Sequence, residues 1–133
     1  MFLLDTNTIS HWIRASNPAL QRHFAQVSLS DLFVSSVVEA ELRYGIAKRG
    51  LEKSRAGGLV DTFLSNVAIL AWTSSTAKRF ARLRTDSEAA GVTIATADLM
   101  IATHAYEHGI TLVTQDRALL QLTSWIAVAD WIS

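Results

Sequence analysis

The sequence predicts an α/β fold, in which helices cover both faces of a central parallel sheet of four to five strands. Short apolar runs alternate with longer segments of helical periodicity along the whole chain, the pattern of parallel strands joined by right-handed crossovers. The first run ends abruptly at Asp5, and Thr6 and Asn7 behind it favour a helix start. With 133 residues, the chain has room for a single domain, residues 1–133, around one hydrophobic core.

The helices are predicted from their periodicity and from the residues that start and stop them. Ser16 marks a break, Ser36 and Glu39 form a capping box, Thr96 is an N-cap, and Gly109 ends a helix. The predicted helices are residues 6–14, 18–26, 36–48, 52–66, 73–90 and 96–108, with a short helix near 118–121.

The strands are predicted from short runs of β-branched and aliphatic residues. Residues 110–114, Ile-Thr-Leu-Val-Thr, are the clearest of these runs. The predicted strands are residues 1–4, 32–35, 67–72, 110–114 and 126–129.

The composition describes a compact globular protein, with 50% hydrophobic and 18% charged residues. Without cysteine, the chain can form neither a disulfide framework nor a thiolate metal site. No window has the uninterrupted apolar length that is needed to span a bilayer, and no basic segment followed by an apolar run opens the chain. We therefore expect a soluble, cytoplasmic protein.

Net charge does not indicate a nucleic-acid binder, because twelve basic and twelve acidic residues cancel. The basic residues are nevertheless clustered, which suits either a polyanionic substrate or simply solvated helix faces. The two clusters are Arg43, Lys48, Arg49, Lys53 and Arg55, and Lys78, Arg79, Arg82 and Arg84.

Four acids lie at junctions that this fold would bring together. Asp5 follows the first strand and Asp116 follows the strand at residues 110–114, so both would lie over one crevice if these strands are neighbours where the winding reverses. Glu41 lies in the helix after the second strand, and Asp98 in the first turn of the helix before the fourth. Asp5 and Asp98 also have purely structural explanations, as a helix cap and as an acid favoured by the helix dipole.

Glu39 and Glu41 cannot both face the crevice, because two positions along a helix are about 200° apart. The capping box already explains Glu39, whereas Glu41 has no local explanation. We therefore assign Glu41 to the crevice.

Converging carboxylates repel one another, and a divalent cation is their natural counter-ion. A set of oxygen ligands suits the hard ions Mg²⁺ or Mn²⁺ and suits Zn²⁺ poorly. Because Mg²⁺ commonly binds substrate phosphates, the sequence predicts phosphoryl chemistry on a nucleotide or nucleic acid, with one metal ion or two.

Several segments of the chain, in order, resemble the PIN-domain ribonucleases, and among them the VapC toxins of type II toxin–antitoxin pairs. The resemblance extends over almost the whole chain. It rests on Leu4-Asp5-Thr6-Asn7, Ser35-Ser36, Glu41-Leu42-Arg43-Tyr44-Gly45, Asp98-Leu99-Met100-Ile101-Ala102, His104-Ala105, Leu112-Val113-Thr114 with Asp116, and Asp130-Trp131.

The resemblance implies a PIN-like three-layer α/β/α sandwich whose acidic quartet holds Mg²⁺ or Mn²⁺. The quartet would be Asp5, Glu41, Asp98 and Asp116, and whether Asp116 is a direct ligand stays open. Thr6, Asn7 and Thr114 would support the site, Thr6 by orienting Asp5 or a bound water.

The same resemblance implies an activity and partners. Members of the family hydrolyse RNA phosphodiester bonds, often in transfer or ribosomal RNA, usually form homodimers, and are blocked by a cognate antitoxin. A catalytically inactive PIN-like module that binds RNA or protein is the alternative.

Two other motifs suggest different functions. Residues 104–108 spell H-x-x-E-H, a zinc-protease pattern, but only 25 residues remain after His108 to supply a third ligand, so packing or surface histidines are the preferred interpretation. A phosphoacceptor receiver would need an acid pair near the N-terminus and a late lysine, and here Asp5 stands alone and no lysine follows Lys78.

The four tryptophans could stack on bases, but core or dimer-interface positions are preferred.

Overall fold

The structure is a computed structural model that describes residues 1–15 and 17–132, so the break predicted at Ser16 lies outside the described residues. The strands are β1 (Phe2–Leu4), β2 (Leu32–Ser35), β3 (Ala68–Leu70), β4 (Thr111–Val113) and β5 (Val128–Ala129). The α-helices are α1 (Thr6–Ile13), α2 (Pro18–Ala25), α3 (Ser36–Lys48), α4 (Arg55–Ser65), α5 (Ser74–Ala89) and α6 (Thr96–His108), with 3₁₀ turns at Leu29–Asp31 and Leu119–Leu122. The predicted order of elements is confirmed, and the last predicted helix is a 3₁₀ turn.

All five strands form one parallel sheet in the order β3-β2-β1-β4-β5. The chain therefore builds one side of the sheet from β1 to β3 and then crosses to the other side for β4 and β5. The point where the winding reverses lies between β1 and β4, where Leu4 is in register with Val113. This confirms that the strands before Asp5 and Asp116 are neighbours.

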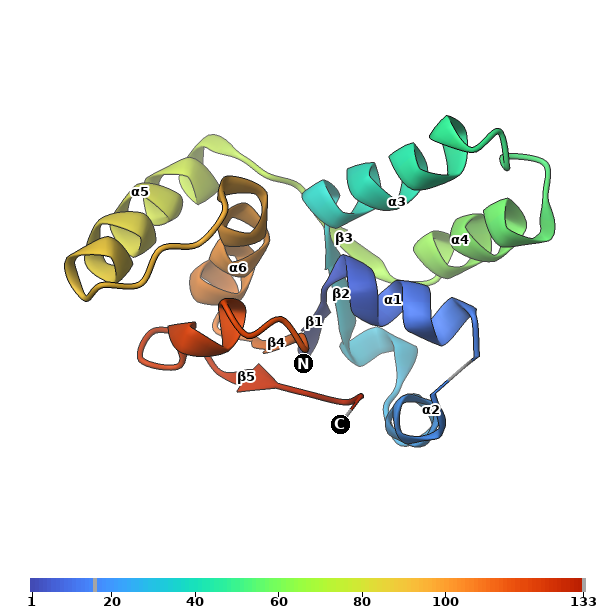
Figure 1. Cartoon of the computed structure of the whole chain (residues 1–133), viewed down its shortest axis with the longest axis horizontal. Helices are drawn as coiled ribbons and strands as arrows, with labels where there is room; N and C mark the ends of the chain where they lie inside the picture. Colours follow the sequence, from blue (N-terminus) through green and yellow to red (C-terminus); the bar gives the residue numbers. More distant parts are fainter. Residues whose placement is uncertain (16, 133) are drawn as a thin grey trace.

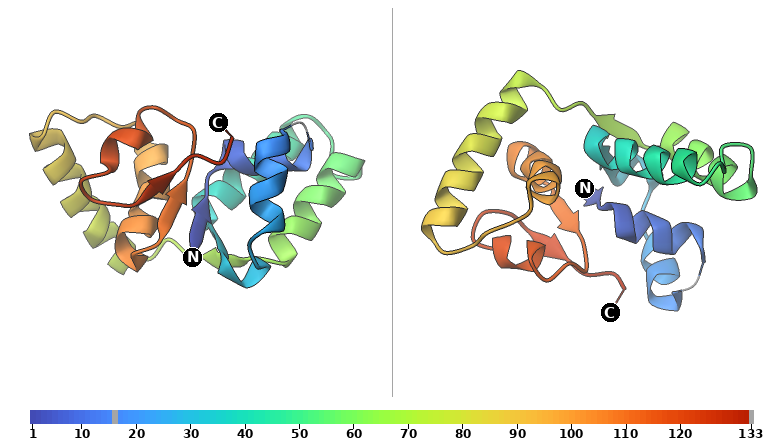
Figure 2. Two further views of the ribbon diagram at one scale, coloured as in Figure 1. Left: turned by 90° about the horizontal axis from the view of Figure 1, so that it is seen from below. Right: turned by 45° about the horizontal axis from the view of Figure 1, so that its top comes forward.

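Helices form a layer on each side of the sheet (Figure 1). Helices α1 to α4 gather on one side, and α5 and α6 pack together on the other, as right-handed crossovers in opposite directions require. The two further views show the same separation (Figure 2). The predicted three-layer α/β/α sandwich is confirmed, and its core includes the fully buried strand residues Leu3, Leu4, Val34, Leu112 and Val113.

The start of α3 differs from the predicted capping box. Ser35, not Ser36, is the N-cap, and its hydroxyl accepts a hydrogen bond from Val37 N at 3.1 Å. The Ser36 hydroxyl accepts from Trp72 N at 3.1 Å, which fixes the segment after β3. Glu39 makes an ion pair with Arg43 at 3.2 Å instead of capping the helix.

Two other helix starts also differ from the prediction. Thr96 is the first residue of α6, and the N-cap is Ala95, without a side-chain cap. Helix α4 begins at Arg55 and not near residue 52, because Ser54 caps it and residues 51–54 form a turn against it. A Cβ at Gly57 would lie 2.4 Å from the Leu51 carbonyl oxygen, so glycine allows this turn to pack closely.

Local chemistry explains both ends of α5 and the end of α6, where Gly109 stops the helix as predicted. Thr73 and Thr76 form a capping box at the start of α5. Gly91, with φ 82°, follows the helix, and Gly109 ends α6 in the left-handed conformation. Within the described ranges, no helix is both long and apolar enough to cross a membrane.

Candidate active site at the carboxyl edge of the sheet

Asp5 lies at the end of β1 and is 5% exposed. Its Oδ1 accepts a hydrogen bond from Thr8 N at 2.8 Å, so it does cap α1. Its Oδ2 accepts from the Thr114 hydroxyl at 2.5 Å, across the junction between β1 and β4. Each carboxylate oxygen keeps a further lone pair, so capping does not prevent Asp5 from binding a ligand.

Asp98 provides the strongest sign that the acids share one environment. Burial raises its pKa above the ordinary value of 3.8, and the negative charges of Asp116, Glu41 and Asp5, in this order, raise the pKa further. The other three predicted acids therefore act electrostatically on Asp98, although they come from three other segments. Burial and like charge both disfavour the ionised form of an acid, the condition that a bound cation relieves.

Glu41 extends from α3 towards α1. Its Oε1 accepts a hydrogen bond from the Thr6 hydroxyl at 2.5 Å. The Thr6 hydroxyl thus donates to Glu41 and not to Asp5, while the other role expected from the sequence, orienting a bound water, stays a prediction. Glu39 binds Arg43 and is not one of the charges that act on Asp98, which agrees with the choice of Glu41 for the crevice.

Asp116 follows β4 in a turn that Thr114 helps to fix. The Asp116 N–H donates to the Thr114 hydroxyl oxygen at 3.0 Å, and Asp116 Oδ1 accepts from Ala118 N at 2.8 Å. The Thr114 hydroxyl therefore links Asp5 to the backbone of Asp116. The Asn7 side chain is exposed and makes no hydrogen bond to the described residues.

The donor chemistry of this site fits a hard divalent cation. Within residues 1–15 and 17–132, none of the four carboxylates forms an ion pair with a basic side chain, so their repulsion is not neutralised there. In the same ranges, no three His, Asp or Glu side chains form a ready-made cage for a metal ion. Binding of one ion by all four acids would require their side chains to lie closer together than they do here.

The histidines of the H-x-x-E-H motif have packing roles. His104 is fully buried, and its Nε2 lies 3.2 Å from the Ala71 carbonyl oxygen. Since a carbonyl can only accept, Nε2 carries the proton, and Nδ1 has no partner among the described residues. Glu107 accepts from the Thr76 hydroxyl at 2.8 Å and lies 3.4 Å from His108 Nε2. The hydrogen bond between Thr76 and Glu107 ties α6 to α5, and the His104 contact ties α6 to the segment after β3.

Stability should fall in mild acid because of His104. Burial lowers its pKa from the ordinary value of 6.5, so the unfolded chain binds this proton first as the pH falls. The contribution to stability is complete above about pH 6.5 and is lost below it, by at most about 1.4 kcal/mol per pH unit for one proton. Chemical denaturation between about pH 5 and 7 should show this slope, and His104→Gln, which keeps a donor but does not titrate, should reduce it.

His108→Gln is the matched control, because the His108 side chain is 44% exposed. That variant should keep most of the slope, because the charge of His108 lowers the pKa of His104 less than burial does. An unchanged slope in His104→Gln would contradict the assignment.

The sequence did not predict two contacts or juxtapositions near the site, although it placed Arg49 in a basic cluster. Gln115, between Thr114 and Asp116, has its amide nitrogen 3.3 Å from His11 Nε2, which connects the β4 turn to α1. Arg14 and Arg49 line the same pocket as Thr6 and Glu41. Neither feature follows from a local sequence pattern, because the partners lie on different elements.

The structure also shows what three arginines of the predicted basic clusters and two of the tryptophans contact. Arg43, Arg82 and Arg84 each bind acids on their own or a neighbouring helix, so their charge is largely neutralised. Trp12 stacks on Phe24, and Trp131 is 5% exposed and stacks on His23. These two tryptophans are packing residues and not base-stacking platforms.

A five-stranded parallel sheet with four acids gathered over its carboxyl edge defines a PIN-like α/β/α protein. Residues 2–123 match the PIN domain, and the chain belongs to this family. Ribonuclease VapC2 of Rickettsia felis is 31% identical over 117 residues, which cover 87% of each chain. The tRNA(fMet)-specific endonuclease VapC of Salmonella typhimurium is 28% identical over 130 residues, 98% of this chain and 97% of that protein. The crystal structure of VapBC2 from Rickettsia felis, bound to a DNA fragment from its promoter, has a TM-score of 0.84 at 27% identity and covers 98% of both chains.

Proposed function

We propose that this protein is a metal-dependent endoribonuclease and the toxin of a toxin–antitoxin pair. The observation that carries the proposal is the junction of β1 and β4, where the Thr114 hydroxyl joins Asp5 to the backbone of Asp116. The raised pKa of Asp98, caused by burial and by the charges of Asp116, Glu41 and Asp5, supports it. Four coupled carboxylates at the switch point of a parallel sheet suit a reaction that handles phosphate charge. The relatives named as ribonucleases make RNA the preferred substrate class.

Asp5, Glu41, Asp98 and Asp116 would hold Mg²⁺ or Mn²⁺. When bound, such an ion lowers the pKa of a water and offsets the charge on the phosphate and the leaving oxygen. The side chains of this chain supply the orientation: Thr114 fixes Asp5, and Thr6 fixes Glu41. Asn7, which is exposed in the first turn of α1, is the third residue that we propose to support the site.

A cognate antitoxin is the proposed partner, because the similar structure from Rickettsia felis is a VapBC2 complex. We also infer a homodimer that acts in the cytoplasm on transfer or ribosomal RNA. The name of the Salmonella typhimurium relative, which specifies tRNA(fMet), supports the transfer-RNA class without fixing the substrate of this chain.

The proposal is tested by incubating purified, antitoxin-free protein with total transfer RNA and with ribosomal RNA, in Mg²⁺, in Mn²⁺ and in EDTA. We expect defined cleavage products that require one of the metals and that Asp5→Asn does not produce. Binding of RNA without cleavage in either metal would reject the enzyme and favour a non-catalytic PIN-like module.

A further inference from the structure

A pocket of about 290 Å³ extends from the acidic site along the groove between α1, α3 and α4. Thr6 and Glu41, which share a hydrogen bond, line it together with Arg14 and Arg49. Each arginine lies eight residues beyond the site residue on the same helix, a rise of about 12 Å. Figure 1 shows that α1 and α3 both start near the middle of the molecule and run outwards. We call this hollow the arginine pocket.

The two arginines of this pocket are free to bind an anion. Within residues 1–15 and 17–132, neither Arg14 nor Arg49 forms an ion pair or a side-chain hydrogen bond. A basic residue at a helix C-terminus is favoured by the helix dipole, and each of these two is a C-cap. The C-cap position of Arg14 and Arg49 therefore does not by itself indicate a binding role. The evidence for such a role is that both line a pocket with Thr6 and Glu41.

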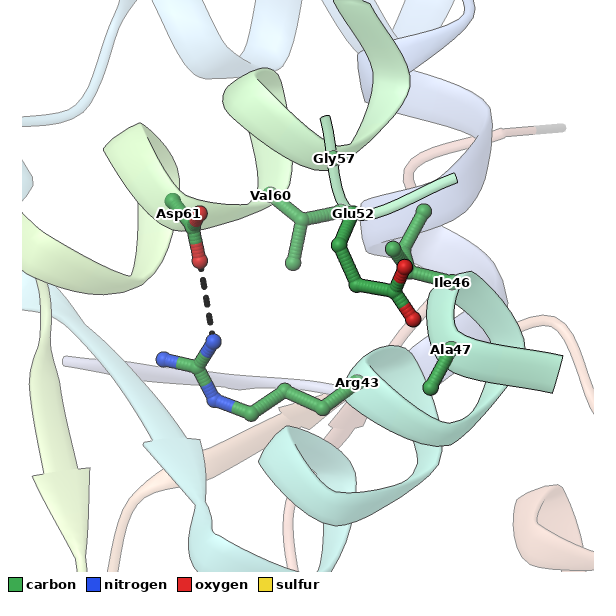
Figure 3. A pocket seen from close by; sticks show the side chains of 7 residues that line it. All are labelled: Arg43, Ile46, Ala47, Glu52, Gly57, Val60 and Asp61. Carbon is green, nitrogen blue, oxygen red and sulfur yellow. Dashed lines mark hydrogen bonds and ion pairs between the residues drawn. The ribbon is translucent and has the colours of Figure 1, made fainter. Parts of the chain in front are cut away.

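The neighbouring pocket between α3 and α4 has the opposite character. It measures about 260 Å³, shares Ile46 and Val60 with the arginine pocket, and contains Arg43, Glu52 and Asp61. Figure 3 shows the Arg43 side chain reaching across to Asp61, and the distance between the two is 2.9 Å. With its arginine paired and a second carboxylate in Glu52, this pocket does not suit a polyanion.

We propose that the arginine pocket holds the RNA strand beside the scissile phosphate, with Arg14 and Arg49 bound to backbone phosphates. This inference rests on the proposed function. The planar guanidinium group matches phosphate oxygens in a bidentate manner. The two cations also offset the repulsion between the RNA and the four carboxylates, at a place separate from them. The apolar floor, which includes Ile13, Leu42 and Ile46, contacts the sugars or bases between the phosphates.

RNA is preferred over a protein partner as the occupant because the pocket is continuous with Glu41. Under the proposed function, the scissile phosphate lies at the acids, so the flanking nucleotides must leave the site along an adjoining surface. The arginine pocket is such a surface, and it carries unpaired charge of the correct sign. An acidic peptide could bind the same two cations, but it would have no need for a surface continuous with Glu41.

The test compares Arg14→Gln, Arg49→Gln and the double variant with Arg22→Gln. Arg22 is an exposed arginine on α2 that forms no ion pair in the described ranges and does not line this pocket. Affinity is measured in EDTA by fluorescence anisotropy of a fluorescein-labelled, mixed-sequence single-stranded oligoribonucleotide at several KCl concentrations. KM and kcat are measured on the RNA that the unmodified protein cleaves.

We expect each pocket substitution to weaken RNA binding about tenfold, the scale of a charged hydrogen bond. The slope of log affinity against log salt should decrease by about 0.7 for each phosphate that the variant no longer binds. KM should rise while kcat stays the same, and Arg22→Gln should change neither. Arg14→Lys should restore much of the salt slope, because it returns the charge without the planar geometry.

Unchanged affinity and salt slope in the double variant would overturn the inference, while cleavage by the unmodified protein would still support the nuclease. Loss of self-association or of binding to another protein, with RNA affinity intact, would also overturn it. If the double variant does not fold, the two single variants decide the question. If the unmodified protein binds RNA through this pocket but never cleaves it, the pocket stands and the proposed function fails.

Discussion

Replacing Asp98 with asparagine should abolish RNA cleavage and, in metal-free buffer, raise the stability of the protein. Activity should fall by about 100-fold or more, the scale on which removing one preorganised electrostatic group slows catalysis. Stability should rise because the carboxylate is destabilised where it lies, by burial and by the charges of Asp116, Glu41 and Asp5. The change from oxygen to an amide nitrogen preserves shape, so the fold should not change.

The sign of the pH dependence follows from the direction of the pKa shift. Because the folded-state pKa of Asp98 lies above its unfolded value, its stabilising contribution is complete below about pH 3.8 and is lost as the pH rises through the folded pKa. The Asp98→Asn variant has no such loss. The difference in the free energy of unfolding between the variant and the unmodified protein should therefore grow from about pH 4 towards neutrality in EDTA.

Asp31→Asn is the matched control, since Asp31 is exposed and lies in the 3₁₀ turn before β2. That variant should keep both activity and the pH profile. Asp5→Asn is a less clean test of repulsion, because an amide nitrogen cannot accept the hydrogen bond from Thr114. Full cleavage by the Asp98→Asn protein would remove Asp98 from the site.

Much of the fold could be predicted because strand and helix patterns alternate so regularly, and because Gly109, Pro18 and Thr73 mark helix ends by local chemistry. The order of the strands in the sheet could not be predicted from such local signals. The adjacency of β1 and β4 depends on long-range packing. The sequence therefore predicted only that Asp5 and Asp116 would meet if these two strands are neighbours. The structure fulfils that condition, and Thr114 spans the two strands.

The differences at the start of α3 and at Arg43 share a physical cause. Ser35 and Ser36 are equivalent as candidate caps in the sequence, and a residue 36 positions away, Trp72, takes the hydroxyl of Ser36. Arg43 belongs to a basic cluster in the sequence, yet its guanidinium group binds Asp61 on the next helix. In each case a tertiary contact decides between local alternatives, and local patterns contain no information about it. The effect of the other three acids on Asp98 likewise depends on the folded arrangement, although each acid was chosen from the sequence.

Substituting Glu41 and Glu39 in parallel should separate a site residue from its neighbour on the same helix. Glu41→Gln should reduce cleavage by about 100-fold through loss of one negative charge at the site. Its stability should change little, because the glutamine oxygen can still accept from Thr6. Glu39→Gln should leave activity intact and lower stability by only about 0.2 to 0.5 kcal/mol, the contribution of an i,i+4 pair on a helix surface.

Single-turnover cleavage and thermal melting of both variants measure these differences. The comparison is demanding because the two glutamates differ by two positions, share a helix and undergo the same chemical change. A loss of cleavage in both variants would indicate that helix α3 itself is disturbed. Loss in Glu39→Gln alone would mean that Arg43, released from its partner, matters more than the charge of Glu41. Only a loss confined to Glu41→Gln agrees with the geometry in which Thr6 holds Glu41 beside Asp98.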